Sequence, residues 1–210
     1  NYNFQSFLFL SPKKIIISIR DENNSEEFYK IEKKIDYYSN NEMLEYLNNF
    51  LDENIFKIEK KFKNFVESLT LIIDDNVFFP IKISVKKQNY NQLLSKQSLV
   101  YPINVAKDEY EKTHHENKLA HIIIENYKID NKDYSSLPKN IRCAIFSLDI
   151  KFICFPKDKY DNIKNVLRRY QISINRLICS SYVLDFFPQN KHDIFKNTKY
   201  LIDGCNENEV

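Results

Sequence analysis

The pattern of apolar and polar positions predicts alternating strands and a helix in the first part of the chain. The apolar runs FLFL and IIISI, separated by a polar turn, predict a hairpin over residues 7–20, and FYKIEKKI predicts a further strand. Apolar residues then recur at helical spacing over residues 43–51 and 55–69, and LII at residues 71–73 predicts a short buried strand. We expect a small α/β layer over residues 1–76.

The middle of the chain predicts a strand, a helix and two further strands. The segment VFFPIKISVKK alternates like a half-buried strand, and Pro80 within it indicates an edge position or a bulge. Helical spacing over Ser98–Glu116 is followed by the apolar run Leu119–Ile124 and by a long regular alternation over Ala144–Cys154. We expect these elements to form one unit over residues 77–155.

The last part of the chain returns to a mixture of helices and strands. Helical spacing over residues 158–170 is followed by a strand over 172–179 and by a helix that Pro188 ends. The run Tyr200–Ile202 predicts a last short strand that leads to Asp203 and Gly204. We therefore expect an α/β protein of three consecutive parts, at residues 1–76, 77–155 and 156–210.

Composition and charge argue against several classes of partner. Lys and Arg number 31 and Asp and Glu 29, so the net charge of +2 gives no strong field for nucleic acid or anionic lipid. Arg168 and Arg169 are read as the solvated face of a helix whose core-facing side carries Tyr170. No apolar run approaches the roughly 20 residues that cross a bilayer, and we expect no signal peptide. We expect a cytoplasmic protein without a nucleic-acid partner.

Glycine and cysteine counts limit the chemistry further. Gly204 is the only glycine, although loops that wrap a phosphate use glycine for close approach of backbone amides. The four cysteines have no paired spacing for zinc or redox work, and we read them as small core residues of a reducing compartment. They are Cys143, Cys154, Cys179 and Cys205.

Histidines and paired acids supply no recognisable catalytic or metal site. His114, His115 and His121 lie close together in sequence, but no Cys or carboxylate completes a ligand spacing. The pairs Asp74–Asp75 and Asp130–Asp133 are typical of strand ends and turns, where Asp accepts backbone hydrogen bonds. We predict no catalytic residue and no metal ligand.

The order of elements and the local sequence resemble those of the bacterial cell-division protein FtsA, an actin-like ATPase family. HIIIENYKID resembles a family strand, with Tyr127 and Asp130 at the matching places, and Asn162 matches the Asn that precedes a family helix. KYLIDG resembles the start of a strand and turn that contact nucleotide phosphates. The resemblance implies a partial actin-like (ribonuclease H-like) lobe with an inserted strand-helix-strand-strand module at residues 77–155. The type IV pilus protein PilM shares this architecture.

The phosphate-binding turns depart from the family pattern. Phe9 stands where the family has an acid and Ser11 where it has a glycine, while Lys14 retains a basic position. At the second turn, Asp203 and Gly204 are followed by Glu207 and Glu209 instead of small residues. The degenerate positions are Phe9, Ser11, Lys14, Asp203 and Gly204. Together with the expected absence of the family's second lobe, they lead us to expect no bound ATP and no other cofactor.

We therefore expect a non-catalytic, FtsA-like interaction component of the division machinery. Its expected partners are divisome proteins such as FtsZ or another FtsA-like copy, which would hold it at the inner face of the cell membrane. One alternative is a nucleotide-binding actin-like ATPase whose second lobe lies beyond Val210. The other is a PilM-like adaptor of a pilus or secretion platform.

Overall fold

The computed structural model describes residues 3–37 and 39–210 and contains two compact units. The first unit consists of Asn1–Val77 and Pro156–Asp203, and the second of Phe78–Phe155 and Gly204–Val210. The second unit is therefore an insertion in the first, and it also includes the last residues of the chain. This differs from the expected division, which kept residues 156–210 together.

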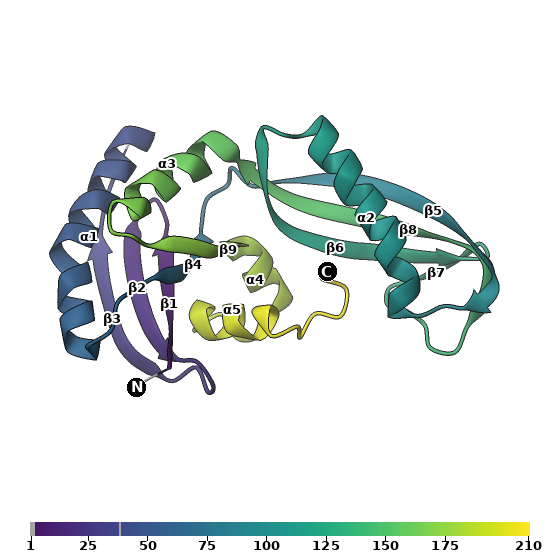
Figure 1. Ribbon diagram of the computed structural model, residues 1–210, viewed down its shortest axis with the longest axis horizontal. Helices are drawn as coiled ribbons and strands as arrows, with labels where there is room; N and C mark the ends of the chain where they lie inside the picture. Colours follow the sequence, from purple (N-terminus) through teal and green to yellow (C-terminus); the bar gives the residue numbers. More distant parts are fainter. Residues whose placement is uncertain (1–2, 38) are drawn as a thin grey trace. The chain divides into compact units, whose positions relative to one another are not determined.

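A five-stranded mixed sheet forms the centre of the first unit (Figure 1). The sheet has the order β3-β2-β1-β4-β9; β1, β2 and β3 are antiparallel neighbours, whereas β4 is parallel to both β1 and β9. The predicted hairpin and the strands predicted at FYKIEKKI, at residues 71–73 and at residues 172–179 are confirmed. The bounds are β1 (Phe4–Leu10), β2 (Lys14–Asp21), β3 (Glu27–Lys34), β4 (Ser68–Ile73) and β9 (Ser173–Cys179).

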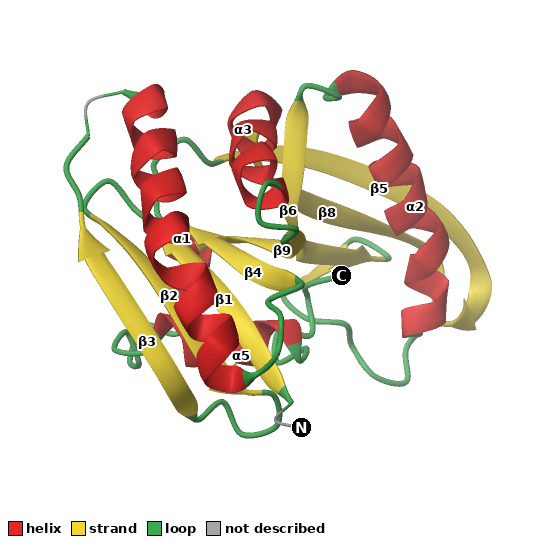
Figure 2. Cartoon of the chain, turned by 60° about the vertical axis from the view of Figure 1, so that its left-hand side comes forward, coloured by secondary structure: helices red, strands yellow, loops and turns green. Residues whose placement is uncertain are grey.

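Helices cover both faces of this sheet, and Figure 2 shows α1 in front of it and α5 behind. Phe7 and Phe9 of β1 form a cluster with Phe195 and Leu201 of α5 and with Val183 of α4. Because both faces are covered, β1 and β2 are buried almost continuously instead of alternating. The helices are α1 (Asn40–Phe62), α3 (Lys157–Arg168), α4 (Ser180–Phe186) and α5 (Ile194–Ile202).

The first long helix ends earlier than its apolar spacing predicts. Helical spacing extends to Leu69, but α1 ends at Phe62 and Leu69 belongs to β4. Lys63 adopts a left-handed φ of 51° as the C-cap, and the Glu59 carboxylate accepts a hydrogen bond from the Val66 amide at 3.1 Å. The left-handed residue ends the helix. The apolar residues after it, Phe65, Val66 and Leu69, happen to continue the helical spacing in the sequence although they lie outside the helix.

The predicted strand at residues 200–202 is wrong, because these residues form the last turn of α5. The Asp193 side chain caps this helix by accepting a hydrogen bond from the Lys196 amide. Phe195 and Leu201 then fall on the helix face that packs against the sheet. A short apolar run fits either element, and here packing of the amphipathic face selects the helix.

The second unit is a four-stranded sheet with one helix, and its order β5-β8-β6-β7 makes β5 an edge strand that carries Pro80, as predicted. Leu99, Ile103 and Tyr110 of α2 pack on the face that contains Phe152. The elements are β5 (Phe79–Leu93), α2 (Lys96–Thr113), β6 (Asn117–Ile129), the short β7 (Lys132–Tyr134) and β8 (Arg142–Pro156). The predicted strand-helix-strand-strand order is thus present with one short strand added.

The C-terminal tail joins the second unit by pairing with β6. The Ile124 amide donates to the Asn208 carbonyl at 2.8 Å, and the Val210 amide donates to the Ile122 carbonyl at 3.0 Å. Next to this pairing, Nδ1 of the buried His121 lies 2.8 Å from Oε1 of Glu209. The tail therefore forms an isolated antiparallel bridge to β6 next to a buried side-chain pair.

Candidate functional site

The turn between β1 and β2 is where the resemblance places one phosphate-binding loop. The Ser11 hydroxyl accepts hydrogen bonds from the Lys13 amide at 3.3 Å and the Lys14 amide at 3.1 Å. The Ser11 amide donates to the Lys14 carbonyl at 3.0 Å, and Pro12 has no N–H to offer. The N–H groups of this turn are therefore used within the turn, and a phosphate would have to displace those bonds.

A cavity of about 370 Å³ lies beside this turn in the first unit and contains a buried guanidinium. Arg20 forms ion pairs with Glu27 and Asp193, both at 2.9 Å, and its guanidinium lies 5.3 Å from the Phe195 ring centroid. These two carboxylates neutralise the buried cation, and Asp74 adds a third acid to the lining. The remaining cations of the lining are lysines at positions 14, 30 and 191.

Phe9, Ser11 and Lys14 lie together at this turn. Asp203 is the C-cap of α5 and is bound to Lys199 at 2.8 Å, and Gly204 belongs to the tail of the second unit. Gly204 has φ +87°, which explains the glycine there. Positive φ also occurs at non-glycine residues such as Asp130 and Asn131, so scarcity of glycine does not prevent left-handed turns.

Three of the four paired acids accept hydrogen bonds of the kind that their sequence context predicts. Asp75 accepts a hydrogen bond from the Val77 amide, and Asp130 accepts one from the Ile145 amide. Asp133 accepts one from the Asn126 side chain. These carboxylates thus serve turns and neighbouring strands.

The histidines and cysteines are mostly structural as well. His114 and His115 lie in the connection after α2, and His121 is buried beside the tail. Across residues 3–37 and 39–210, no group of three or more His, Cys, Asp and Glu side chains is placed to hold a metal ion. Cys143, Cys154 and Cys179 are buried as predicted, whereas Cys205 is exposed and the prediction of a core position is wrong for it.

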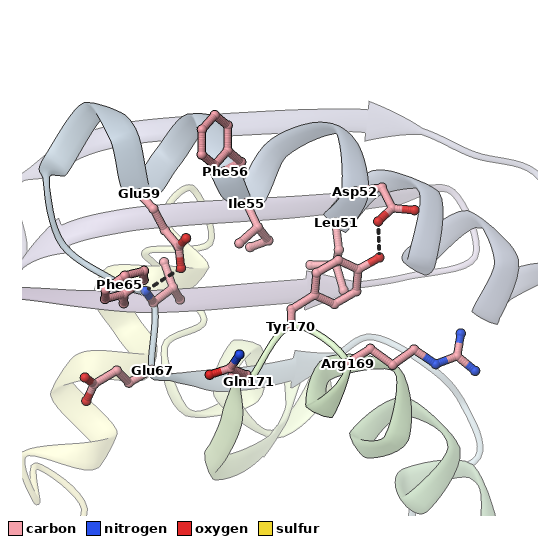
Figure 3. A pocket seen from close by; sticks show the side chains of 11 residues that line it. Leu51, Asp52, Ile55, Phe56, Glu59, Phe65, Glu67, Arg169, Tyr170 and Gln171 are labelled. Atoms are coloured by element: carbon pink, nitrogen blue, oxygen red, sulfur yellow. Dashed lines mark hydrogen bonds between the residues drawn. The ribbon is translucent and has the colours of Figure 1, made fainter.

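A second hollow in the first unit, which we call the aromatic groove, has a volume of about 480 Å³. Figure 3 shows its side chains, which come from α1, from the connection between α1 and β4, and from the turn after α3. Its lining consists of Leu51, Asp52, Ile55, Phe56, Glu59, Phe65, Val66, Glu67, Arg169, Tyr170 and Gln171.

Side-chain hydrogen bonds fix the floor of the aromatic groove. The Tyr170 hydroxyl donates to Oδ1 of Asp52 at 2.7 Å, and Arg169 donates to Oδ1 of Asn48 at 3.2 Å. Burial and the adjacent Asp52 carboxylate raise the pKa of Tyr170 to about 12, so the phenol stays protonated at neutral pH. The sequence predicts Tyr170 as a core-facing residue of a helix, but it lies in the turn after α3 and is only half-buried.

Sequence reasoning missed this groove because it placed Phe65 on the buried face of a longer helix. In the structure Phe65 lies after the helix and is 71% exposed, and Phe56 of α1 is 72% exposed. Phe56 falls outside the apolar spacing of α1, which was the available signal for an exposed aromatic residue.

Comparison with known proteins gives structural similarity only. No family model matches the sequence, and no curated protein sequence matches it. A chain of the PilM–PilN type IV pilus biogenesis complex superposes with a TM-score of 0.52 at 7% identity, covering 89% of this chain and 50% of that chain.

Two further structures superpose less well. A Bacteroides thetaiotaomicron protein with actin-like ATPase fold and unknown function has a TM-score of 0.42 at 15% identity, covering 89% of this chain and 56% of that one. The cytoplasmic domain of EpsL, an inner membrane component of the type II secretion system of Vibrio cholerae, has a TM-score of 0.36 at 9% identity. The match covers 86% of this chain and 57% of that one. The chain therefore spans about half the length of these three proteins. The predicted fold class, a partial actin-like lobe with an inserted module, is confirmed.

Proposed function

We propose that this chain is a non-catalytic adaptor that binds another protein instead of hydrolysing a nucleotide. The observation that carries the proposal is the Ser11 turn, whose amides bond to the Ser11 hydroxyl and the Lys14 carbonyl. An actin-like ATPase needs such amides for phosphate. The pairing of Arg20 with two carboxylates in the neighbouring cavity supports the same conclusion.

The kind of complex is proposed from the similarity to the PilM–PilN structure. That structure pairs one protein with another in pilus biogenesis, and its TM-score of 0.52 supports a shared fold. We therefore favour an adaptor of a pilus or secretion platform. A component of the division machinery that binds FtsZ or a second copy is the other candidate, favoured by the FtsA-like segments HIIIENYKID and KYDNIKNVLRRYQ. In the part of the chain that the structure describes, no helix is long and apolar enough to cross a membrane.

The first experiment tests nucleotide binding by thermal unfolding with ATP and Mg²⁺. A ligand that binds only the folded state raises the melting temperature, so we expect no rise for this chain at millimolar ATP. Ser11→Gly is the matched variant, because it frees the Lys13 and Lys14 amides from the Ser11 hydroxyl. A rise of several degrees in the unchanged chain would refute the non-catalytic proposal.

The second experiment decides between the two kinds of complex. The purified chain is mixed separately with FtsZ and with the cytoplasmic segment of an inner-membrane pilus protein from the same organism, and binding is measured by calorimetry. Saturable binding of the pilus segment alone supports the pilus or secretion adaptor. Saturable binding of FtsZ alone would transfer the proposal to the division machinery, and binding of neither would contradict both assignments.

A further inference from the structure

The geometry points to the aromatic groove as a docking site for a peptide that carries large apolar side chains beside Lys or Arg. This inference rests on the proposed adaptor function and names the site and the chemistry of the partner. It comes from the exposed aromatic residues, the charges of the lining and the way in which the groove is held open.

Exposed aromatic side chains are the first observation. Phe56 and Phe65 are 72% and 71% exposed, and both line the same hollow as the buried Leu51, Ile55 and Val66. Figure 3 shows Ile55 and Leu51 extending from α1 toward the ring of Tyr170. An apolar floor that continues into two uncovered rings is typical of a surface that a partner covers.

The charges of the lining select the partner. Asp52, Glu59 and Glu67 are acidic, whereas Arg169 is the basic residue of the lining. Lysines near the end of α1 do not contribute to it, and Lys61 instead lies 4.6 Å from the Tyr29 ring centroid. The excess of carboxylates favours a cationic partner, and aromatic rings next to them also attract Lys and Arg.

The three carboxylates of the lining differ in their hydrogen bonds, which determines which of them is available to a partner. Asp52 accepts from the Tyr170 hydroxyl, and Glu59 accepts from the Val66 amide, so both are fixed in place. Glu67 is exposed, and among the described residues no hydrogen bond or ion pair engages its carboxylate. Glu67 is therefore the acid best able to form an ion pair with a side chain of the partner.

The groove is preorganised, so a partner would bind without extensive rearrangement. Lys63, the C-cap of α1, and Gln171 of the lining adopt left-handed φ values of 51° and 60°, which are unfavourable for side chains of this kind. Such positions persist where the surroundings determine the backbone, and here they set the connection after α1 and the turn after α3. A fixed groove loses less entropy on binding than a flexible one.

The experiment uses two synthetic peptides as probes, one alternating Leu with Lys and one alternating Leu with Glu. Binding to the full chain is followed by fluorescence anisotropy, and we expect the Lys peptide to bind about tenfold more tightly at low salt than at high salt. The double variant Phe56→Ser with Phe65→Ser should abolish binding, and Glu67→Lys should weaken it several-fold. Tyr90→Ser is the matched control, because Tyr90 is 74% exposed in the second unit.

Several results would overturn the docking proposal. They are equal binding of the two peptides, full binding by the Phe double variant, and an equal loss in Tyr90→Ser. Self-association of the chain that the Phe double variant abolishes, with no peptide binding, would assign the groove to a second copy instead. All of these outcomes leave the ATP result unchanged, so failure of the docking site is distinguishable from failure of the non-catalytic proposal.

Discussion

The two units of this protein use their sheets in different ways. In the first unit helices cover both faces, and its most buried ion pairs lie inside, where Arg20 is 5% exposed. In the second unit α2 covers one face, and the other carries an ion-pair row of Lys82, Glu125 and Lys151. The first unit therefore depends on continuous burial, whereas the second combines an apolar face with a polar one.

This difference explains why the functional candidates lie in the first unit. Its helices leave grooves between elements, and its connections carry left-handed residues such as Lys63 and Gln171 that fix those grooves. The open sheet face of the second unit pairs Glu125 with two lysines, and a hollow of about 390 Å³ in this unit is lined mostly by polar side chains such as Lys86, Lys128 and Ser147. A groove with uncovered aromatic rings offers more binding energy than a mostly polar hollow.

The largest expected effect comes from removing a core aromatic side chain in each unit. Phe50→Ala in α1 and Phe152→Ala in β8 should each lower the free energy of unfolding by about 3–5 kcal/mol, because each leaves a cavity in a packed core. Hydrogen exchange measured by mass spectrometry should show faster exchange in β1, β2 and β4 for Phe50→Ala, and in β5 and β8 for Phe152→Ala. Equal acceleration in both units by one variant would show that they unfold together.

A smaller effect is expected from removing the buried cation of the first unit. Arg20→Met should lower the free energy of unfolding by about 1–3 kcal/mol, because it leaves Glu27 and Asp193 without their counterion. Partial exposure of both acids limits the loss, which urea denaturation measures. Lys13→Met is the control, because its ion pair with Asp36 is exposed and should change stability by less than about 0.5 kcal/mol. A similar loss in the two variants would contradict a special role for burial.

In the second unit, removing the Glu209 carboxylate should release the tail from β6. Glu209→Ala should cost about 1–2 kcal/mol, because the buried His121 loses its hydrogen bond at 2.8 Å. Amide exchange at Ile124 and Val210 should accelerate, which NMR can follow. Glu207→Ala serves as the control because Glu207 is exposed, and unchanged exchange in Glu209→Ala would show that the backbone pairing alone holds the tail.

The smallest expected effect is the acid sensitivity of the open sheet face. Hydrogen bonds from Lys82 and Lys151 lower the pKa of Glu125, and hydrogen bonds from Ser84 and Asn126 lower that of Asp149. The two carboxylates therefore stabilise the fold above their unfolded-state pKa values of about 4. This stabilisation is lost as the pH falls through their lower folded-state pKa values.

We expect a loss of about 0.5–1 kcal/mol from this face between pH 6 and 3, since its charges are partly exposed to solvent. The double variant Glu125→Gln with Asp149→Asn should lack that part of the pH dependence when stability is measured by urea denaturation at each pH. An unchanged profile in the variant would show that other acids cause it.

Much of the fold could be predicted from local patterns. Alternation in β5 and β8 and the apolar hairpin of β1 and β2 identified the strands, because burial on one or two faces leaves a direct trace in the order of residues. The end of α1 and the identity of residues 200–202 could not be predicted in this way. Both depended on caps and on packing against a distant strand, which short apolar runs do not encode.

The sequence by itself determined the α/β class, the inserted module and the departure of Phe9 and Ser11 from a phosphate-binding turn. Only the tertiary structure decided that the Ser11 hydroxyl occupies the turn amides, that Arg20 is neutralised, and that the tail pairs with β6. It also brought Phe56 and Phe65 to the same groove as Tyr170. The physical reason is that periodicity reports which side of an element is buried, whereas a binding site depends on residues far apart in sequence that packing brings together.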